Sequence, residues 1–160
     1  MLSKAMGMST TYEWETPPEV FGPLNKEFGP FTLDVAASDK NKKAPGYCTK
    51  RLDGLKATWR GRVWMNPPYG RGISDWIRKA YESAKSGDAE IVVCLIPART
   101  DTSWWHDYIQ GKADVRFLRG RVQFIRPGKK LDNAPFPCAV VVYRSGQSRK
   151  GCCGHGPFQD

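Results

Sequence analysis

A chain of 160 residues, 40% of them hydrophobic, is long enough to bury a core, which excludes a protein disordered throughout. It has no run near the roughly 18 apolar residues of a membrane span, and Met1 to Ser9 lack the apolar stretch of a secretory signal, so we expect a cytoplasmic protein without a membrane partner. The 25 Lys and Arg residues outnumber the 16 Asp and Glu residues, and the net charge of +9 favours a polyanionic partner.

Positive charge gathers in two stretches of the chain. The first comprises Lys40, Lys42, Lys43, Lys50, Arg51, Lys56, Arg60 and Arg62. The second comprises Arg116, Arg119, Arg121, Arg126, Lys129 and Lys130. These stretches predict a binding face for a polyanion, and a merely basic protein is the alternative that charge alone leaves open.

The first predicted helix begins at Thr16. This residue is a good N-cap, Pro17 suits the first helical position, and Glu19 completes a capping box. Hydrophobic residues then recur at helical spacing at Val20, Leu24 and Phe28. Gly29-Pro30 ends the helix.

Short strands and a long loop follow this helix. Residues 31–37 read as a short strand, and residues 38–62 are polar and basic, so they are mostly loop. Residues 62–65 form a second short strand, which stops abruptly at Asn66-Pro67-Pro68.

The central segment predicts a helix followed by a buried strand. Ser74 can cap the helix, whose hydrophobic residues lie on one face. These residues are Ile73, Trp76, Ile77, Ala80, Tyr81 and Ala84. Residues 91–96 are continuously apolar, as expected for a strand buried on both faces, and Pro97 ends it.

The remaining segments complete an α/β pattern. We expect a short helix over residues 102–110, strands over 115–118 and 121–125, a loop over 126–137 and a last strand over 139–143. The alternation predicts a compact Rossmann-like α/β fold, with a mostly parallel sheet and an antiparallel strand pair at the C-terminal end. We expect a single domain over residues 12–144 and flexible termini at 1–11 and 145–160.

The five cysteines are expected to be free thiols, because their number is odd and their spacing is irregular. Cys94 and Cys138 lie in apolar runs and are predicted to be core residues. The group Cys152, Cys153 and His155 lacks a second ligand pair, so we expect a flexible tail there and no metal in the protein.

The tetrapeptide Asn66-Pro67-Pro68-Tyr69 carries groups suited to an amino group on an aromatic ring. Such a nitrogen is a poor nucleophile, and two hydrogen-bond acceptors would push electron density back onto it. The Asn66 side-chain oxygen and the Pro67 carbonyl can be those acceptors. Pro68 keeps the preceding residue extended, and Tyr69 can stack on a base, an interaction of about 1–3 kcal/mol. A tight turn at a strand end is the purely structural alternative.

Together with other segments, this motif resembles the phage-type DNA N6-adenine methyltransferases, which use S-adenosylmethionine. The matching segments are residues 14–19, 33–38, 53–55, 62–71, 97–101, 117–121 and 134–137. The resemblance covers about residues 12 to 144. It implies methylation of N6 on an adenine flipped out of duplex DNA, in a bacterial or phage-infected cell, with Asn66, Pro67, Pro68 and Tyr69 as the catalytic residues.

The resemblance also implies cofactor contacts from Trp14, Thr16, Pro17, Asp34, Ala36, Ser38, Asp53 and Leu55. Alternatives stand beside three of these roles: Thr16 as a helix cap, Asp34 as an ordinary strand-end carboxylate and Asp53 as a turn residue. Phosphate or target-strand contacts are implied for Arg71, Arg99, Arg119 and Arg121, unless they are solvated surface charges. Phe124 would close the second face of the flipped adenine or belong to the core.

The chain departs from the family pattern at two points. The segment 34–38 lacks the glycines of the usual cofactor loop, and the interval between Asp34 and Asn66 is too short for the helix–strand–helix–strand passage of larger enzymes, so the fold is trimmed. No separate target-recognition domain fits either. Sequence specificity would therefore come from the loops near 97–113 and 126–137, or from the second subunit of a homodimer.

Three other functions compete with this hypothesis. Enzymes that methylate protein glutamine use the same tetrapeptide, but they have a glycine-rich loop and an extra helical domain, which this sequence lacks. Adenine-N6 methylation of RNA would require the same acceptor site. A non-catalytic DNA-binding protein on a methyltransferase scaffold would tolerate loss of Asn66 or Tyr69, and both are present.

Overall fold

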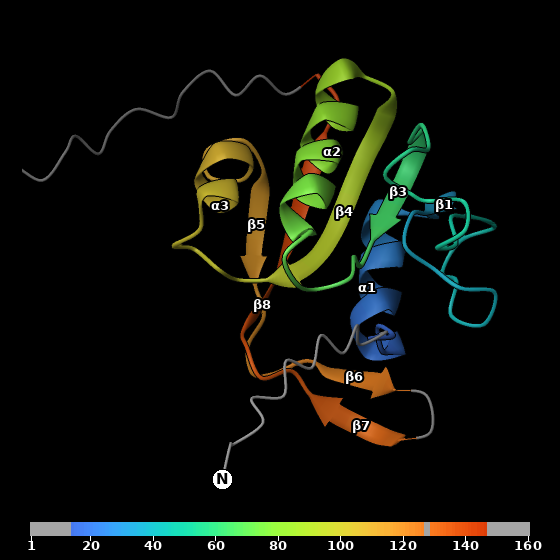
Figure 1. Ribbon diagram of the computed structural model, residues 1–160, viewed down its shortest axis with the longest axis vertical. Coiled ribbons are helices and arrows are strands. Elements are labelled where there is room, and N and C mark those ends of the chain that lie inside the picture. Colours follow the sequence, from blue (N-terminus) through green and yellow to red (C-terminus); the bar gives the residue numbers. More distant parts are fainter. Residues whose placement is uncertain (1–13, 127–128, 147–160) are drawn as a thin grey trace, which may run out of the picture.

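The computed structural model describes residues 14–126 and 129–146, which form a six-stranded sheet, three helices and a separate two-stranded hairpin (Figure 1). The helices are α1 (Pro18–Phe28), α2 (Ile73–Ser86) and α3 (Ser103–Tyr108). The strands are β1 (Leu33–Asp34), β2 (Gly46–Tyr47), β3 (Gly61–Met65), β4 (Ala89–Pro97), β5 (Asp114–Phe117), β6 (Gln123–Arg126), β7 (Lys129–Asn133) and β8 (Cys138–Arg144).

The main sheet has the strand order β2-β1-β3-β4-β8-β5. The pairs β1–β2, β1–β3 and β3–β4 are parallel, whereas β8 runs antiparallel to both β4 and β5. The carboxyl ends of β1, β3, β4 and β5 therefore meet at one edge, at the end of the sheet that faces the β6–β7 hairpin in Figure 1. The predicted α/β class, with a mostly parallel sheet and an antiparallel strand pair, is confirmed.

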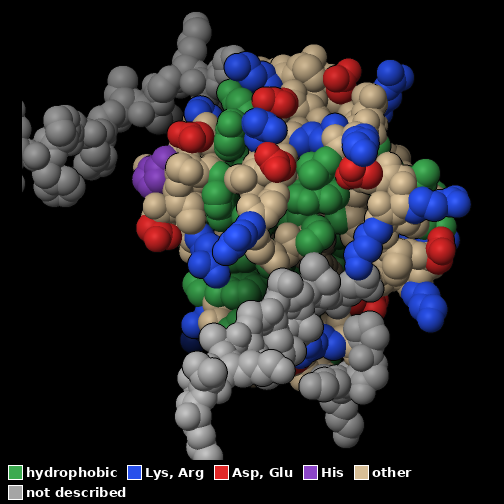
Figure 2. Space-filling view, viewed as in Figure 1, with side chains coloured by type: hydrophobic (Ala, Val, Ile, Leu, Met, Phe, Trp, Pro, Cys, Tyr) green, Lys and Arg blue, Asp and Glu red, His purple; other side chains and the backbone are tan. Residues whose placement is uncertain are grey.

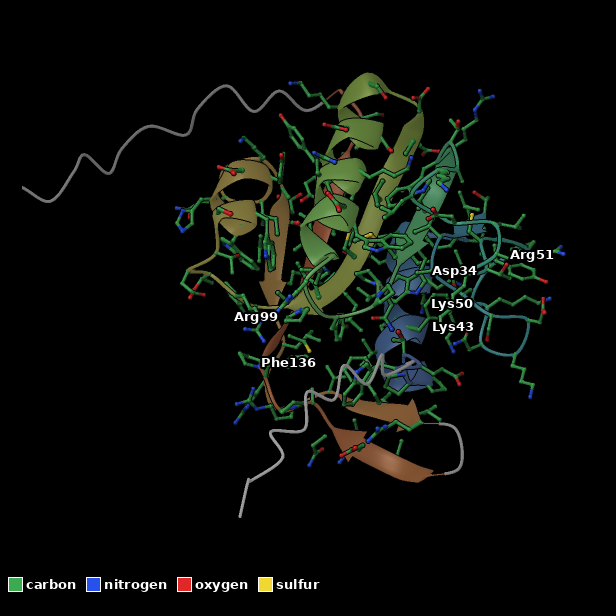
Figure 3. The ribbon with its side chains drawn as sticks, in the orientation of Figure 1. Asp34, Lys43, Lys50, Arg51, Arg99 and Phe136 are labelled. Atoms are coloured by element: carbon green, nitrogen blue, oxygen red, sulfur yellow. The ribbon has the colours of Figure 1, made fainter. Side chains whose placement is uncertain are left out.

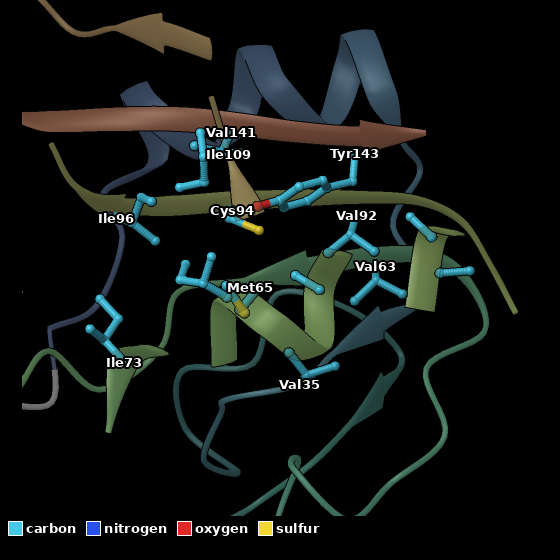
Figure 4. Close-up of a cluster of buried hydrophobic side chains, with 14 of the residues drawn as sticks. Val35, Val63, Met65, Ile73, Val92, Cys94, Ile96, Ile109, Val141 and Tyr143 are labelled. Atoms are coloured by element: carbon cyan, nitrogen blue, oxygen red, sulfur yellow. The ribbon is translucent and has the colours of Figure 1, made fainter. Parts of the chain in front are cut away.

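Helices cover both faces of the sheet because its central strand is apolar on both sides. Val92, Cys94 and Ile96 of β4 pack on the face that α2 and α3 cover (Figure 4). Ile91, Val93 and Leu95 pack on the opposite face, with α1 and the hairpin. The predicted burial of Cys94 and Cys138 is confirmed, and both are free thiols.

Both helices with predicted caps begin elsewhere than predicted. Helix α1 begins at Pro18 after the N-cap residue Pro17, and the Thr16 side chain caps nothing. Helix α2 begins at Ile73 with Gly72 at the N-cap, so the capping role predicted for Ser74 is also wrong. The Thr16 hydroxyl does not cap the helix because it accepts a hydrogen bond from the side chain of Asn66, which lies 50 residues further along the chain.

The predicted strand over residues 31–37 is reduced to Leu33–Asp34. The Asp34 carboxylate accepts a hydrogen bond from the backbone N–H of Ala36, and this bond turns the chain away from the sheet.

The loop predicted over residues 126–137 is wrong in part, because β7 lies within it and pairs with β6. Residues 129–133 lack an apolar alternation, so their strand conformation comes from pairing with β6 rather than from a local pattern.

Several expectations concern residues outside the described ranges. These include the N-terminal residues 1–11, the C-terminal residues from 147 onward and the Cys152, Cys153 and His155 group. Among residues 14–126 and 129–146, no helix combines the length and the apolar character needed to cross a membrane.

Candidate active site

A pocket of about 230 Å³ lies at the carboxyl ends of β1 and β3. Its walls come from the segment before α1, the loops after β1 and β2, the first turn of α2 and the start of the tetrapeptide. The lining residues are Trp14, Val35, Ala36, Ala37, Ser38, Asn41, Cys48, Thr49, Lys50, Asp53, Gly54, Asn66, Pro67, Pro68 and Trp76. The pocket thus lies at the strand ends where ligands bind in open α/β sheets.

The buried carboxylate of Asp34 shapes the loop that follows β1. Its Oδ2 accepts a hydrogen bond of 2.9 Å from the Lys43 backbone N–H, and its Oδ1 accepts one of 3.3 Å from Ala36. Burial raises the pKa of Asp34 from 3.8 to about 6, although these N–H groups and the Lys43 charge act in the opposite direction. Asp34 itself does not line the pocket; it holds the two ends of the loop that does.

Gly54 allows two walls of the pocket to approach closely. A Cβ at this position would collide with the Val35 carbonyl oxygen and would lie 2.9 Å from the Trp76 ring. The Gly54 carbonyl also accepts a 2.7 Å hydrogen bond from the buried Trp59 indole, which stacks on Trp76. Only glycine fits here, because the chain passes between a backbone oxygen and an indole.

Asp53 precedes this glycine and adopts a left-handed conformation, with φ of 49°. Its Oδ1 accepts a hydrogen bond of 3.1 Å from the Leu55 backbone N–H, and its Oδ2 lies 3.5 Å from the Lys56 ammonium. Asp53 therefore combines the turn role that the sequence allowed with a place in the pocket wall, whereas Leu55 lies outside that wall.

The Asn66 side chain is held at both ends. Its Nδ2 donates hydrogen bonds to the Trp14 carbonyl, at 2.6 Å, and to the Thr16 hydroxyl, at 3.1 Å. Its Oδ1 accepts a hydrogen bond of 2.7 Å from the Tyr69 hydroxyl. The segment Trp14–Thr16 thus packs directly on the tetrapeptide, and the Asn66 oxygen is turned away from that segment.

Tyr69, the last residue of the tetrapeptide, has its hydroxyl turned toward the interior of the protein. This hydroxyl lies 3.1 Å from the Leu95 carbonyl as well as close to Asn66, and burial raises the Tyr69 pKa well above its ordinary value. Its ring meets Phe124 and Phe136 edge-on, with centroids 6.0 and 5.4 Å away. Phe124 is fully buried, so it occupies the core position that was its alternative in the sequence.

Pro67 and Pro68 continue the wall of the pocket beyond Asn66. Pro67 is buried and Pro68 is exposed. Within residues 14–126 and 129–146, no donor forms a hydrogen bond with the Pro67 carbonyl. The site therefore offers two acceptors on consecutive residues, the side-chain oxygen of Asn66 and the backbone oxygen of Pro67.

The arginines divide into paired and unpaired groups. Ion pairs join Arg62 to Glu90, Arg78 to Asp75, Arg116 to Glu27, Arg126 to Asp132 and Arg144 to Asp114. Among the described residues, six exposed arginines form no ion pair: Arg51, Arg60, Arg71, Arg99, Arg119 and Arg121. The two basic stretches are therefore partly neutralised within the protein, and these six arginines keep their charge for other partners.

Basic side chains flank the site on two sides. In Figure 2, Lys and Arg side chains gather over the loops after β1, on the right of the view. Figure 3 places Lys43, Lys50 and Arg51 on that side, and Arg99 beside Phe136 at the ends of β4 and β8. The backbones at Ala98 and Pro137 are joined by a 2.9 Å hydrogen bond, which supports this second placement.

The structure brings together only some of the residues predicted to bind a cofactor. Trp14, Ala36, Ser38 and Asp53 line the pocket, whereas Thr16, Pro17, Asp34 and Leu55 do not. Sequence reasoning missed Val35, Ala37, Asn41, Cys48, Thr49, Lys50, Gly54 and Trp76. Gly54 was interpreted only as part of a turn after Asp53, and Trp76 only as part of the helix face that covers the sheet.

Comparison with known proteins identifies the family. A family model described as DNA N-6-adenine-methyltransferase (Dam) matches residues 6–151. The DNA N-6-adenine-methyltransferase of Escherichia phage T1 is 33% identical over 150 residues, covering 82% of this chain and 62% of the phage protein. The protein YfdM of Escherichia coli (strain K12), named as a methyltransferase, is 34% identical over 64 residues, covering 36% of this chain and 70% of that protein.

This chain is also similar to a solved structure, and the matches cover different shares of the proteins compared. A Pyrococcus horikoshii protein named as an RNA methyltransferase covers 66% of this chain and 52% of its own, with 18% identity and a TM-score of 0.42. The chain spans just under two thirds of the phage T1 protein. The family model, by contrast, extends over nearly all of the chain. This chain belongs to the DNA N-6-adenine-methyltransferase (Dam) family.

Proposed function

We propose that this protein transfers a methyl group from S-adenosylmethionine to N6 of an adenine in DNA. One observation carries the proposal: a single pocket is lined both by the loop after β1 and by Asn66, Pro67 and Pro68. A methyl donor and an amino group can therefore meet at one place. Family membership and the name of the phage T1 relative support adenine N6 as the acceptor and DNA as the substrate.

The lining of the pocket fits the proposed cofactor, which supplies an activated methyl group when it is bound. Val35, Ala36 and Trp76 offer apolar surface for a purine ring. Ser38, Asn41 and Thr49 offer polar groups for the ribose and the amino-acid end. Asp53 adds a carboxylate at the same wall, so the mixture of apolar surface and few polar groups is typical of a nucleoside-type ligand site.

Asn66 and Pro67 would hold the amino group of the adenine. The two N6 hydrogens would be donated to Asn66 Oδ1 and to the Pro67 carbonyl, which returns electron density to the nitrogen as it bonds to the methyl carbon. The bond between methyl and sulfur would break in the same step, S-adenosylhomocysteine would leave, and the methylated nitrogen would lose one proton to solvent. The adenine would have to leave the base stack to reach these acceptors. An arriving amino group would compete with the Tyr69 hydroxyl for Asn66 Oδ1, and the released Tyr69 ring could then stack on the base.

The exposed arginines would hold the DNA around the flipped adenine. Arg71 follows the tetrapeptide, Arg99 follows β4, and Arg119 and Arg121 lie between β5 and β6. Their lack of ion pairs among the described residues leaves their guanidinium groups available to phosphates. Specificity would come from the loops near 97–113 and 126–137 or from a second subunit.

The test is tritiated methyl transfer from labelled S-adenosylmethionine to duplex DNA, single-stranded DNA and RNA of the same sequence. We expect transfer to duplex DNA, and nuclease digestion should recover the label as N6-methyladenine. Asn66→Ala should abolish it, while Glu82→Ala, on the exposed side of α2, should leave it unchanged.

Three outcomes would overturn the proposal. Exclusive transfer to RNA would identify a different substrate. An absence of cofactor binding by calorimetry would support a non-catalytic DNA-binding protein. Wild-type turnover by Asn66→Ala would remove the proposed acceptor mechanism.

A further inference from the structure

The Asn66 side chain presents a problem of orientation. An amide side chain has an oxygen and a nitrogen of nearly the same shape, and its last torsion is broad, so either atom could face a ligand. Only the oxygen can accept a hydrogen from adenine N6. A turned amide would present two N–H donors to the amino group and would block the reaction.

The segment before α1 decides this orientation. The Trp14 carbonyl lies 2.6 Å from one end of the Asn66 amide, and a carbonyl can only accept hydrogen bonds, so the atom that faces it must be Nδ2. An amide nitrogen carries two hydrogens, and the second is accepted by the Thr16 hydroxyl at 3.1 Å. Thr16 is only 1% exposed, so this acceptor lies away from the solvent.

The contacts at the opposite end of the amide do not fix its orientation. The Tyr69 hydroxyl can donate to Asn66 Oδ1, but it also lies close to the Leu95 carbonyl and can donate there instead. A hydroxyl can accept as well as donate, so it is compatible with either orientation of the amide. The Trp14–Thr16 segment is thus the side of the site that distinguishes oxygen from nitrogen.

This segment is itself anchored on two sides. Glu15 forms two backbone hydrogen bonds with Ile125 of the hairpin, at 3.1 and 3.0 Å. The Glu15 carboxylate pairs with the Lys43 ammonium at 3.0 Å, and the Lys43 backbone binds Asp34. The carbonyl that orients Asn66 is therefore fixed to both the hairpin and the loop after β1.

From these contacts we propose that Thr16 is a positioning residue that, together with the Trp14 carbonyl, orients the Asn66 amide so that its oxygen faces the substrate. This inference rests on the proposed methyl transfer, and it gives Thr16 a role distinct from cofactor contact. Without the Thr16 hydroxyl, one Nδ2–H loses its acceptor, and only the Trp14 carbonyl still favours this orientation of the amide. Loss of the Thr16 hydroxyl should therefore lower kcat and leave the affinity for the cofactor unchanged.

The variants Thr16→Val and Thr16→Ser separate the two roles. Thr16→Val keeps the shape and removes the acceptor, and we expect kcat to fall by about 5- to 150-fold, with an unchanged Kd for S-adenosylmethionine measured by calorimetry. Thr16→Ser keeps the hydroxyl and should retain kcat within about threefold. Thr16→Ala serves as a second deletion of the hydroxyl if Thr16→Val does not fold, as judged by circular dichroism.

A readout independent of activity follows the amide directly. In ¹H–¹⁵N spectra, the Asn66 side-chain pair, identified by its loss in Asn66→Ala, should exchange slowly with solvent in the wild type and in Thr16→Ser. It should exchange at least about tenfold faster in Thr16→Val, because its second acceptor is gone. This measurement tests the orientation even if the methyl-transfer proposal fails.

Opposite results would overturn the inference. A Thr16→Val protein with a weakened cofactor Kd and an unchanged kcat would make Thr16 a cofactor contact. An unchanged exchange rate of the Asn66 amide in that variant would show that Trp14 alone holds it.

Discussion

The Tyr69 hydroxyl lies 2.7 Å from Asn66 Oδ1, the oxygen that the proposed reaction requires as an acceptor. In this arrangement the side chain proposed to stack on the substrate covers the atom proposed to bind it. Substrate entry therefore requires a local exchange of hydrogen bonds at Asn66. The exchange would involve one tyrosine side chain, because the contacts of Asn66 with Trp14 and Thr16 are made by Nδ2, the other end of the amide.

Tyr69→Phe should separate the hydroxyl from the ring. The variant removes the competitor for Asn66 Oδ1 and keeps the stacking surface, so we expect KM for DNA to stay the same or fall and kcat to remain within about threefold. Tyr69→Ala removes both and should lower kcat/KM by about 5- to 150-fold, the equivalent of roughly 1–3 kcal/mol of stacking. Steady-state kinetics on duplex DNA provides both values. A Tyr69→Phe protein as impaired as Tyr69→Ala would contradict a stacking role.

Gly54→Ala should destabilise the fold at the pocket. The added Cβ collides with the Val35 carbonyl oxygen and presses on Trp76, and overpacking of this kind costs about 1–3 kcal/mol or more. Thermal unfolding measures the loss. Gly22→Ala is the matched control: it lies within α1, and beyond its chain neighbours and the helix's own backbone no atom lies within 4 Å of an added Cβ. The helical preference of alanine over glycine, about 0.5–1 kcal/mol, is opposed by Pro23, which disfavours helical backbone in a preceding residue that has a Cβ, so we expect a free energy of unfolding close to that of the wild type. Equal Tm values for the two variants would show that the loop moves freely to accommodate the methyl group.

Asp34 should make the protein less stable as the pH rises. Its pKa is about 6 in the folded protein and 3.8 in the unfolded chain, so between these values the folded state binds more protons. The free energy of unfolding therefore decreases with pH across that range, by roughly 3 kcal/mol from this group. The stabilisation is fully present below pH 3.8 and is lost above pH 6.

Denaturant unfolding of the wild type and Asp34→Asn at pH 4 and pH 7 checks this prediction. Other groups titrate alike in both proteins, so the difference between the two free energies isolates Asp34. We expect the wild type to lose stability relative to Asp34→Asn as the pH increases. A pH-independent difference would mean that the Lys43 and Ala36 N–H groups fully offset the burial of the carboxylate.

The exposed arginines should govern the salt dependence of DNA binding. Arg119→Ala and Arg121→Ala should each weaken duplex binding and reduce the slope of log K against log salt by about 1 for each phosphate that is no longer neutralised. Arg78→Ala, whose guanidinium pairs with Asp75 on α2, is the control and should leave the slope unchanged. Fluorescence anisotropy at several salt concentrations gives the slopes. Identical slopes for all three variants would place the DNA elsewhere on the protein.

The local patterns of the sequence were enough to predict the main scaffold. The run over residues 91–96 is apolar at every position, which predicted a strand buried on both faces, and this strand lies at the centre of the sheet. The hydrophobic stripe beginning at Ile73 likewise predicted α2, although the helix begins one residue before the cap that the sequence suggested. At Thr16 the sequence pattern predicted a helix cap, and this prediction was wrong because the Thr16 hydroxyl accepts a hydrogen bond from the distant Asn66 side chain.

The sequence by itself determined the tetrapeptide and its place at the end of a strand, because these depend on residues that are neighbours in the chain. It also determined the family, because the matching segments follow one another in a fixed order along the chain. Only the tertiary structure decided which way the Asn66 amide points, since its partners Trp14 and Thr16 lie 52 and 50 residues away. The same holds for β7, which forms by pairing with β6, and for Gly54, whose constraint comes from the backbone of Val35. Hydrogen bonds and close contacts between distant segments leave no local periodicity in a sequence, so these features appear only once the chain is folded.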